Sequence, residues 1–401
     1  MRYQPKRDAV EVRPKPPVRR LSLRKKAIFS LVVVSACLGM LELAARVVEV
    51  WVPPRAVDFG QGFDLDSRLF EPSLGDPRTM RTRPEKLASF RLQEFAARKP
   101  PGTLRIVALG GSSVNYLDDE FRVLEGRLKA ALSPRYRRVE VINGGGLSYG
   151  SARLARVAAE VLNYEPDLVV FYEAHNEFEE IEQLRLATNW ATRPQQVASR
   201  LALMRVINDR VAVVRLAKLR REHEGRVREQ DLARSAPGAA RAWSHKFTIA
   251  DVAARMEAFR ANMTRIVQLC EARGVPIVLA TVPSNLVKPY LAKEAAEQYR
   301  EVRELIDRGE FERAGVRGRQ VLKESAGRHQ SSDLENAIIR SIARERDVPL
   351  ADVEAAVIRA EPHYLPGETL FMDHCHLNAE GNTILRATVE AEILKLLARP
   401  E

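Results

Sequence analysis

Short apolar runs alternate with longer amphipathic stretches from about residue 104 to the C-terminus. The runs read RIVAL, VEVIN, DLVVFY, PIVLATV and PLADV, at residues 105–109, 139–143, 167–172, 276–282 and 349–353. Before the fourth run, apolar residues recur every three to four positions from Val252 to Cys270, which is the period of an amphipathic helix. Runs of Val, Ile and Leu separated by such helices predict a parallel sheet that is covered on both faces.

Two stretches interrupt this alternation and are predicted to be helical insertions. They cover residues 181–245 and 294–345, and the second contains a sequence at residues 299–314 that is typical of a tetratricopeptide hairpin. A single hairpin does not predict a repeat array, because such arrays need at least three units. Residues 53–103 show no sustained period and are predicted to be an irregular lead-in to the first strand.

The N-terminal region contains a candidate membrane span. Residues 27–41 are uncharged and mostly apolar, and after Glu42 the apolar character continues to Val52, so residues 27–52 are long enough to cross a bilayer. Five basic residues lie within the eight positions that precede this segment. The positive-inside rule then keeps residues 1–26 in the cytoplasm and places the rest of the chain outside it, at a cell (inner) membrane. A buried helix of a soluble protein is the alternative.

A second interpretation of this region is a lipoprotein signal. The residues Val34-Ser35-Ala36-Cys37 resemble a lipobox, in which Cys37 would be acylated after cleavage. The leader before the apolar run is long for a signal peptide, and the run continues past Cys37, so we favour an uncleaved anchor. Both interpretations place the folded domain outside the cytoplasm.

Charge and cysteine content exclude several classes of protein. The net charge is +11, but ten basic and two acidic residues lie within residues 1–26, so the remainder carries little excess charge. With no zinc-finger or RNP pattern either, nucleic-acid binding is not expected. Three cysteines exclude a disulfide-rich scaffold. A bridge between Cys270 and Cys375 is conceivable, although free thiols are the preferred interpretation.

Three of the predicted strands are followed by residues suited to catalysis. The first runs into Gly110-Gly111-Ser112-Ser113, the second into NGGGLSYGS at residues 143–151, and the third into EAHNEF at residues 173–178. Glycine-rich turns can expose a serine or direct backbone N–H groups at a ligand, and an Asn amide can donate to an oxyanion. Taken singly, these segments fit helix caps and turns equally well.

Near the C-terminus, DHCHLNAEG at residues 373–381 carries a carboxylate and two imidazoles. Asp373 and His376 are three residues apart, so the carboxylate can orient the imidazole for proton transfer. A metal site built from Asp373, His374 and His376 is the alternative. It is not favoured, because the sequence has no HExxH motif or second cluster to complete it.

Together, the four segments resemble the SGNH (GDSL-type) hydrolase superfamily in order and spacing, from about residue 98 to the C-terminus. The resemblance implies an α/β, flavodoxin-like three-layer sandwich over residues 104–401. It also implies that Ser112 is the nucleophile, with Ser113 a minor alternative, that His376 is the base and that Asp373 orients it. The oxyanion hole would consist of Ser112, Ser148 and Asn176. Ser148 departs from the family pattern, which has glycine there.

The expected function is that of an extracytoplasmic serine esterase without a cofactor or metal, acting on a carbohydrate or lipid ester and held to the membrane by its N-terminal helix. One alternative is an O-acetyltransferase of an envelope polysaccharide, which shares the triad and differs in the acyl acceptor. Another is a non-catalytic envelope scaffold on the same fold.

Overall fold

The computed structural model describes residues 22–51, 68–73, 75–87, 89–180, 201–207, 247–291 and 293–398. The strands are β1 (Phe70–Pro72), β2 (Thr79–Thr82), β3 (Glu94–Ala96), β4 (Thr103–Gly110), β5 (Arg138–Gly145), β6 (Leu168–Tyr172), β7 (Ile277–Ala280) and β8 (Leu350–Ala351). The α-helices are α1 (Leu23–Trp51), α2 (Ser112–Asn115), α3 (Asp118–Ala131), α4 (Ser151–Val161), α8 (Ile249–Glu271), α9 (Lys293–Asp307), α10 (Phe311–Glu324), α11 (Asp333–Glu345), α12 (Val353–Ala360) and α13 (Ala379–Leu397). Short 3-10 helices lie at Pro84–Lys86, Leu162–Tyr164 and Pro362–Tyr364.

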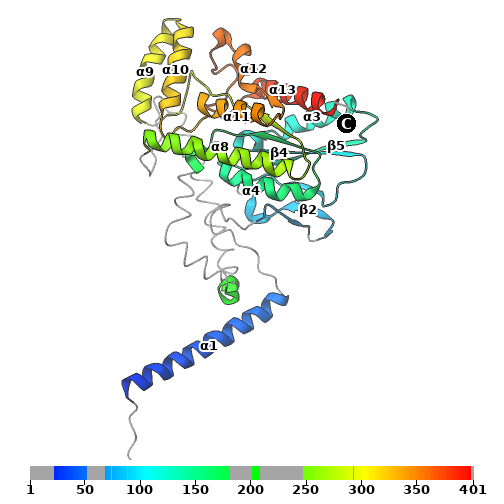
Figure 1. Ribbon diagram of the computed structural model, residues 1–401, viewed down its shortest axis with the longest axis vertical. Coiled ribbons are helices and arrows are strands. Elements are labelled where there is room, and N and C mark those ends of the chain that lie inside the picture. Colours follow the sequence, from blue (N-terminus) through cyan, green and yellow to red (C-terminus); the bar gives the residue numbers. More distant parts are fainter. Residues whose placement is uncertain are drawn as a thin grey trace, which may run out of the picture. The chain divides into compact units, whose positions relative to one another are not determined.

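A five-stranded parallel sheet forms the centre of the larger unit (Figure 1). Its strand order is β5-β4-β6-β7-β8, and every neighbouring pair is parallel. Counted along the chain, this is the 2-1-3-4-5 order of flavodoxin-like folds. Each of the five apolar runs coincides with one of these strands, so the predicted α/β fold is confirmed.

Helices cover both faces of this sheet. On one face α3 packs against β5 and α13, and on the other α4, α8 and α11 pack together. The stripe predicted before β7 is the buried side of α8, where Phe259, Met263, Ile266 and Cys270 are fully buried. Burial of large side chains contributes about 1.5–3 kcal/mol each, so this continuous apolar layer holds the sheet and helices together.

The sequence predicted an irregular lead-in, but part of it has regular secondary structure. Strands β1, β2 and β3 form a small antiparallel sheet within it. The buried aromatic rings of Phe70 and Phe95 stack edge-on in this sheet, with centroids 4.9 Å apart. The strands are three or four residues long and bury only alternate positions, which is too little apolar pattern to detect in the sequence.

The second predicted insertion contains helices, as expected. Within residues 294–345, α9 and α10 form a hairpin that turns at Gly309, whose φ of +73° suits glycine. A second apolar cluster forms between them and includes Tyr299, whose hydroxyl group donates to the Leu286 carbonyl at 2.6 Å. The hairpin is therefore tied to the loop that follows β7.

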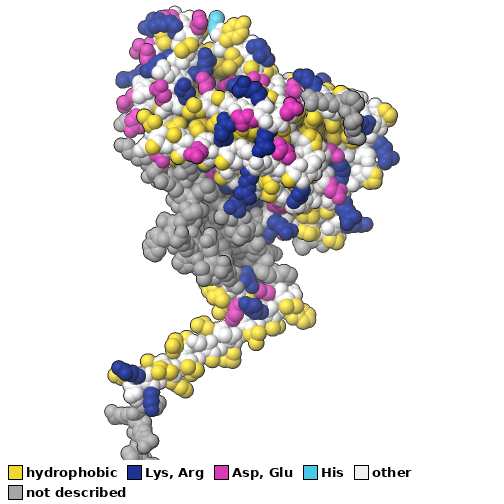
Figure 2. Space-filling view, viewed as in Figure 1, with side chains coloured by type: hydrophobic (Ala, Val, Ile, Leu, Met, Phe, Trp, Pro, Cys, Tyr) yellow, Lys and Arg dark blue, Asp and Glu magenta, His cyan; other side chains and the backbone are white. Residues whose placement is uncertain are grey.

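A separate unit contains α1, a 29-residue helix that is long and apolar enough to cross a membrane. Figure 2 shows hydrophobic side chains along the visible face of this helix, and those of Phe29, Leu31 and Leu43 are more than 60% exposed. The helix begins four residues before the start of the predicted span at residues 27–52 and ends one residue before the end of that span. Its length and exposed apolar surface are compatible with a membrane anchor or a signal sequence.

The two carboxylates of α1 bind a short helix at residues 202–207 in the same unit. Glu42 accepts hydrogen bonds from the backbone N–H groups of Ala202 and Leu203, both at 3.0 Å, and Glu49 pairs with Arg205 at 2.6 Å. Glu42 thus caps that helix at its N-terminus. The rest of the predicted insertion at residues 181–245 lies outside the described residues.

Candidate active site

Ser112 lies at the carboxyl edge of the central sheet, where parallel α/β sheets form their sites. Strand β4 ends at Gly110, and Ser112 is the first residue of the four-residue helix α2. A Cβ atom on Gly111 would lie 2.2 Å from a Glu173 carboxylate oxygen and 2.3 Å from the Asn176 amide nitrogen. Only glycine fits there, and its absence of a side chain brings the serine against these two residues.

The Ser112 hydroxyl oxygen lies 2.7 Å from Nε2 of His376. Nδ1 of the same imidazole lies 2.7 Å from Oδ2 of Asp373. The adjacent hydroxyl group, that of Ser113, is buried and has no hydrogen-bond partner among the described residues. Three of the residues predicted from sequence are therefore brought together in the geometry of a Ser-His-Asp triad, and the hydroxyl group at the imidazole is that of Ser112.

A tight loop before α13 fixes Asp373 and His376. The loop is closed by an antiparallel bridge between Phe371 and Leu377, and Oδ1 of Asp373 accepts the backbone N–H groups of Cys375 and His376, both at 2.8 Å. Burial opposes ionisation of Asp373, but the hydrogen bond from His376 and the charges of nearby histidines outweigh it and hold its pKa well below the ordinary value. The carboxylate is thus ionised and can stabilise an imidazolium.

Asn176 places its amide beside the same serine. Nδ2 donates to the Tyr149 carbonyl at 3.2 Å and lies against Gly111, so the amide faces the turn that carries Ser112. Its backbone N–H donates to Glu173 at 2.8 Å, and the other oxygen of Glu173 accepts the Gly111 N–H at 2.8 Å. Glu173 therefore ties two motif segments together, a role that the sequence did not reveal.

Burial raises the pKa of Glu173 to about 8, because the side chain is 1% exposed and Glu177 lies nearby. Backbone N–H bonds from Asn176, Gly111 and His175 favour the ionised form but do not offset the loss of water. Glu173 thus holds its proton near neutral pH, while Asp373 in the adjacent segment is ionised.

Ser148 occupies the loop between β5 and α4 with a φ of +62°, in the left-handed region. This backbone conformation favours glycine, the residue that the SGNH pattern has at this position, and a serine adopts it at some cost in strain. The next residue, Tyr149, provides the carbonyl that accepts the Asn176 amide. The loop of Ser148 therefore borders the site.

Two of the acidic residues that follow Asn176, Glu177 and Glu180, serve α4 rather than the triad. Glu177 accepts the backbone N–H and the hydroxyl group of Ser151, and Glu180 accepts the N–H groups of Gly150, Ala152 and Arg153. Negative charge at a helix N-terminus is stabilised by the helix dipole. The motif EAHNEFEE thus joins β6 to the start of α4, which explains two of its four carboxylates.

Two further segments support the site and were not identified from sequence. Asn285, which follows β7 and is 1% exposed, donates its amide to the Asp373 carbonyl at 2.9 Å and its backbone N–H to the His374 carbonyl at 3.1 Å. In the lead-in, Phe90 pairs with Gly146 and stacks edge-on against Tyr149 at 4.7 Å. Their contacts join residues far apart in the sequence, so no local pattern predicts them.

The alternative metal site at Asp373, His374 and His376 is not supported by the geometry. Asp373 and His376 bind each other, while Nε2 of His374 lies 2.8 Å from Nδ1 of His329. Among the described residues, two groups have ligand atoms within 4.8 Å of one another, and both include Cys375. Cys37, Cys270 and Cys375 are free, as the preferred interpretation held.

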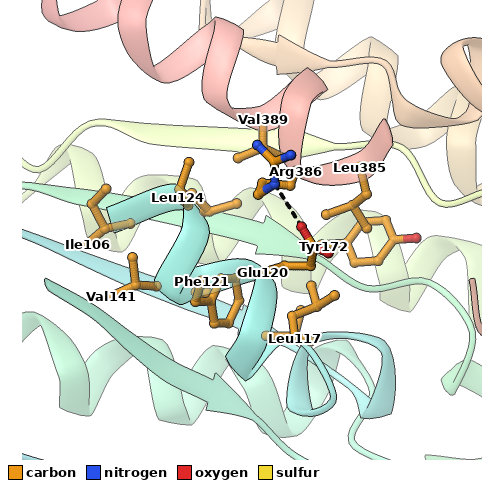
Figure 3. A pocket seen from close by; sticks show the side chains of 13 residues that line it. Ile106, Leu117, Glu120, Phe121, Leu124, Val141, Tyr172, Leu385, Arg386 and Val389 are labelled. Atoms are coloured by element: carbon orange, nitrogen blue, oxygen red, sulfur yellow. Dashed lines mark hydrogen bonds and ion pairs between the residues drawn. The ribbon is translucent and has the colours of Figure 1, made fainter. Parts of the chain in front are cut away.

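An apolar cavity lies away from the triad, between the sheet and helices α3 and α13 (Figure 3). Ile106, Leu117, Phe121 and Leu385 point into it, and an ion pair between Arg386 and Glu120 at 2.7 Å lies at its border. None of the triad residues lines it. The candidate active site is therefore the carboxyl edge of the sheet.

No protein-family model and no curated protein sequence matches the chain. The chain is similar in structure to a GDSL-like lipase from Bacteroides thetaiotaomicron (13% identity, 73% of this chain and 89% of that chain, TM-score 0.34). It is also similar to the acetylxylan esterase Axe2 from Geobacillus stearothermophilus (15%, 72% and 93%, TM-score 0.38) and to another acetyl xylan esterase (12%, 72% and 98%, TM-score 0.39). Identities and TM-scores this low carry no argument about function, so any functional assignment has to rest on the residues of the chain itself.

The strand order is that of a flavodoxin-like sheet, and the four motif segments meet at its carboxyl edge.

Proposed function

We propose that this chain is an extracytoplasmic serine hydrolase that cleaves ester bonds through an acyl-enzyme. The observation that carries the proposal is the hydrogen-bonded series from Ser112 Oγ through His376 to Asp373, with both distances at 2.7 Å. An ionised, partly buried carboxylate and an imidazole at hydrogen-bond distance from a hydroxyl group together activate a serine nucleophile.

In the first half-reaction Ser112 Oγ attacks the ester carbonyl carbon while His376 takes the hydroxyl proton. The tetrahedral intermediate then collapses, the alkoxide leaves with the proton from His376, and the acyl group remains on Ser112. In the second half-reaction His376 deprotonates water, which attacks the acyl carbon. The bond to Ser112 Oγ then breaks, Oγ takes the proton back from His376, and the acid is released. Asp373 stays ionised and stabilises the imidazolium in both.

The oxyanion of each intermediate would be held by three donors, the backbone N–H of Ser112, the amide of Asn176 and the backbone N–H of Ser148. The close approach of the Asn176 amide to Gly111 and the carbonyl contact between Asn176 and Tyr149 support this arrangement. Preorganised donors of this kind contribute about 10²–10³ each to the rate.

The substrate class follows from the proposed location. We place residues 1–26 in the cytoplasm, residues 27–52 in the membrane, and the lead-in at 53–103 and the hydrolase domain at 104–401 outside the cytoplasm. The basic cluster before the apolar segment and the exposed apolar surface of α1 support this orientation. An ester-bearing carbohydrate or lipid of the envelope is then within reach of Ser112.

Hydrolysis of p-nitrophenyl acetate by the full chain in detergent tests the reaction. Wild-type protein and Ser113→Ala should release p-nitrophenol, whereas Ser112→Ala should not. Equal rates for wild type and Ser112→Ala would refute the nucleophile assignment. Adding a sugar alcohol acceptor separates the alternatives, because an O-acetyltransferase would form the acetylated sugar in preference to acetate, and the scaffold alternative predicts neither product.

The orientation has its own test. Protease added to intact spheroplasts should digest the domain that follows α1 and leave a fragment of the N-terminal tail and span protected. Protection of the whole chain would contradict the proposed orientation, and release of a form that begins at Cys37 would establish the lipoprotein alternative.

A further inference from the structure

A buried group of ionisable side chains lies directly behind the triad. Glu179 follows the Asn176 motif, His329 precedes α11, and His374 lies in the loop of Asp373. Their exposed fractions are 7%, 5% and 3%. The triad mechanism uses none of the three, so their concentration in the interior needs a separate explanation.

Their contacts form a second series that ends beside the triad carboxylate. A carboxylate oxygen of Glu179 binds Nε2 of His329, and Nδ1 of His329 lies 2.8 Å from Nε2 of His374. On the far side, Nδ1 of His374 lies 3.8 Å from Oδ1 of Asp373. The series therefore runs from Glu179 through two imidazoles to the carboxylate that holds His376.

The position of protons in this series follows from donor and acceptor counting. A neutral imidazole has a single N–H group. If each ring directs that group to its carboxylate, His329 to Glu179 and His374 toward Asp373, the two facing nitrogens both carry lone pairs at 2.8 Å. That arrangement is repulsive unless a proton lies between them. If instead His374 donates to His329, its other lone pair faces the ionised Asp373 in a buried setting.

Other neighbours favour a positive charge on the pair. The ring of Tyr290 lies 5.3 Å from that of His374, within the range of cation–π attraction, and 6.4 Å from that of His329, just beyond it. The charge of His374 is among the causes that lower the pKa of Asp373. His175, whose pKa burial lowers to about 3, is neutral and adds no competing charge, and Cys375 and His376 complete the ionisable surroundings.

A metal ion between the two imidazoles fits less well. Two nitrogens bound tetrahedrally to zinc at about 2.0–2.1 Å lie roughly 3.3 Å apart, well beyond the spacing of these two rings. Cys375 is close enough to join His329 and His374 as a third ligand, but its sulfur also lies 3.6 Å from Nδ1 of His376. A zinc-bound thiolate there would disturb the triad.

We propose that His329 and His374 share one proton and form a buried cation between Glu179 and Asp373, and that this cation positions the triad carboxylate and limits protonation of His376. The pair acts through Asp373 and does not touch the substrate. Only the kinetic consequence of this proposal rests on the proposed function. By electrostatics, a fixed positive charge behind Asp373 disfavours a second one on His376, which extends activity to lower pH.

The kinetic test uses the pH dependence of inactivation by a fluorophosphonate, measured on the full chain in detergent. His329→Gln removes the shared proton, so the pH at which the inactivation rate halves on the acidic side should rise by about one unit. Tyr290→Phe keeps the ring and changes no charge, so its profile should match wild type. An unchanged or lower midpoint for folded His329→Gln would overturn the proposal.

A second readout does not depend on activity. Proton NMR of Ser112→Ala with labelled histidine ring nitrogens should show a strongly deshielded proton coupled to both rings. The signal should persist in Tyr290→Phe and disappear in His329→Gln or, if that variant does not fold, titrate away at lower pH in Glu179→Gln. Absence of the signal, or stoichiometric zinc in the purified protein, would overturn the inference. Failure of wild type to react with the fluorophosphonate would refute the proposed function alone.

Discussion

The two ends of the central sheet both bury charged side chains, but they use them differently. At the amino end, Arg105 is fully buried and pairs with Glu140 at 2.5 Å, while its other guanidinium nitrogens donate to the carbonyl groups of Tyr164 and Ala96. At the carboxyl end, Glu173, Asn176, His374 and His376 are also buried, whereas Ser112 as a residue is only partly buried.

The difference shows how one sheet separates stability from chemistry. A guanidinium group and a carboxylate that satisfy each other leave nothing to react, so the amino end contributes to the fold. At the carboxyl end the buried groups hold one another through backbone N–H bonds and place a single hydroxyl group, that of Ser112, at the imidazole of His376. Substitutions at the two ends should therefore separate loss of activity from loss of stability.

The largest expected effect is at the carboxyl end. Replacing His376 by Ala removes the base, so the rate of p-nitrophenyl acetate hydrolysis should fall about 10⁴-fold or more, while the unfolding temperature changes little. Steady-state kinetics and thermal unfolding of the same sample measure both. Retention of more than a tenth of the wild-type rate would contradict the role of His376.

The converse is expected at the amino end. Arg105→Leu leaves Glu140 buried without its partner, so the free energy of unfolding should decrease by about 3–5 kcal/mol. The fraction that remains folded should react with a fluorophosphonate at the wild-type rate. Arg78→Leu, at a pair whose arginine side chain is 92% exposed, is the control and should unfold like wild type. A slower reaction of folded Arg105→Leu would contradict the claim that the amino end contributes to stability and not to catalysis.

An intermediate effect is expected from Asn176→Ala. Loss of one oxyanion donor should lower kcat by about 10²–10³ and leave KM nearly unchanged, because the donor acts in the transition state. Separate determination of kcat and KM tests this. A change confined to KM would instead place the amide in ground-state binding.

The smallest effect is the pH dependence of stability from Glu173. Its pKa of about 8, against an ordinary 4.5, means that the folded protein keeps a proton which the unfolded chain releases. This contribution to stability is complete below about pH 4.5 and is lost as the pH rises toward 8. Glu173→Gln cannot ionise, so its Tm should fall less over this range, by on the order of a few degrees. Parallel curves of Tm against pH for wild type and Glu173→Gln would contradict the raised pKa of Glu173.

The sequence predicted the central sheet because each buried parallel strand is a continuous apolar run that can be recognised by itself. It also predicted which motif residues would meet, since parallel strands bring their carboxyl ends to one edge. It did not predict the small sheet of β1, β2 and β3, whose strands are too short to show a period. Glu173, Asn285 and His329 were missed because their partners lie in other segments, and only the tertiary fold joins them.

The measurement that tests the account most directly is the site of covalent labelling. After reaction of the full chain with a fluorophosphonate, peptide mass spectrometry should find the phosphonyl adduct on Ser112 alone, and His376→Ala should abolish it. An adduct on Ser113 or elsewhere, or a folded protein that carries none, would contradict the assignment of Ser112 as an activated nucleophile.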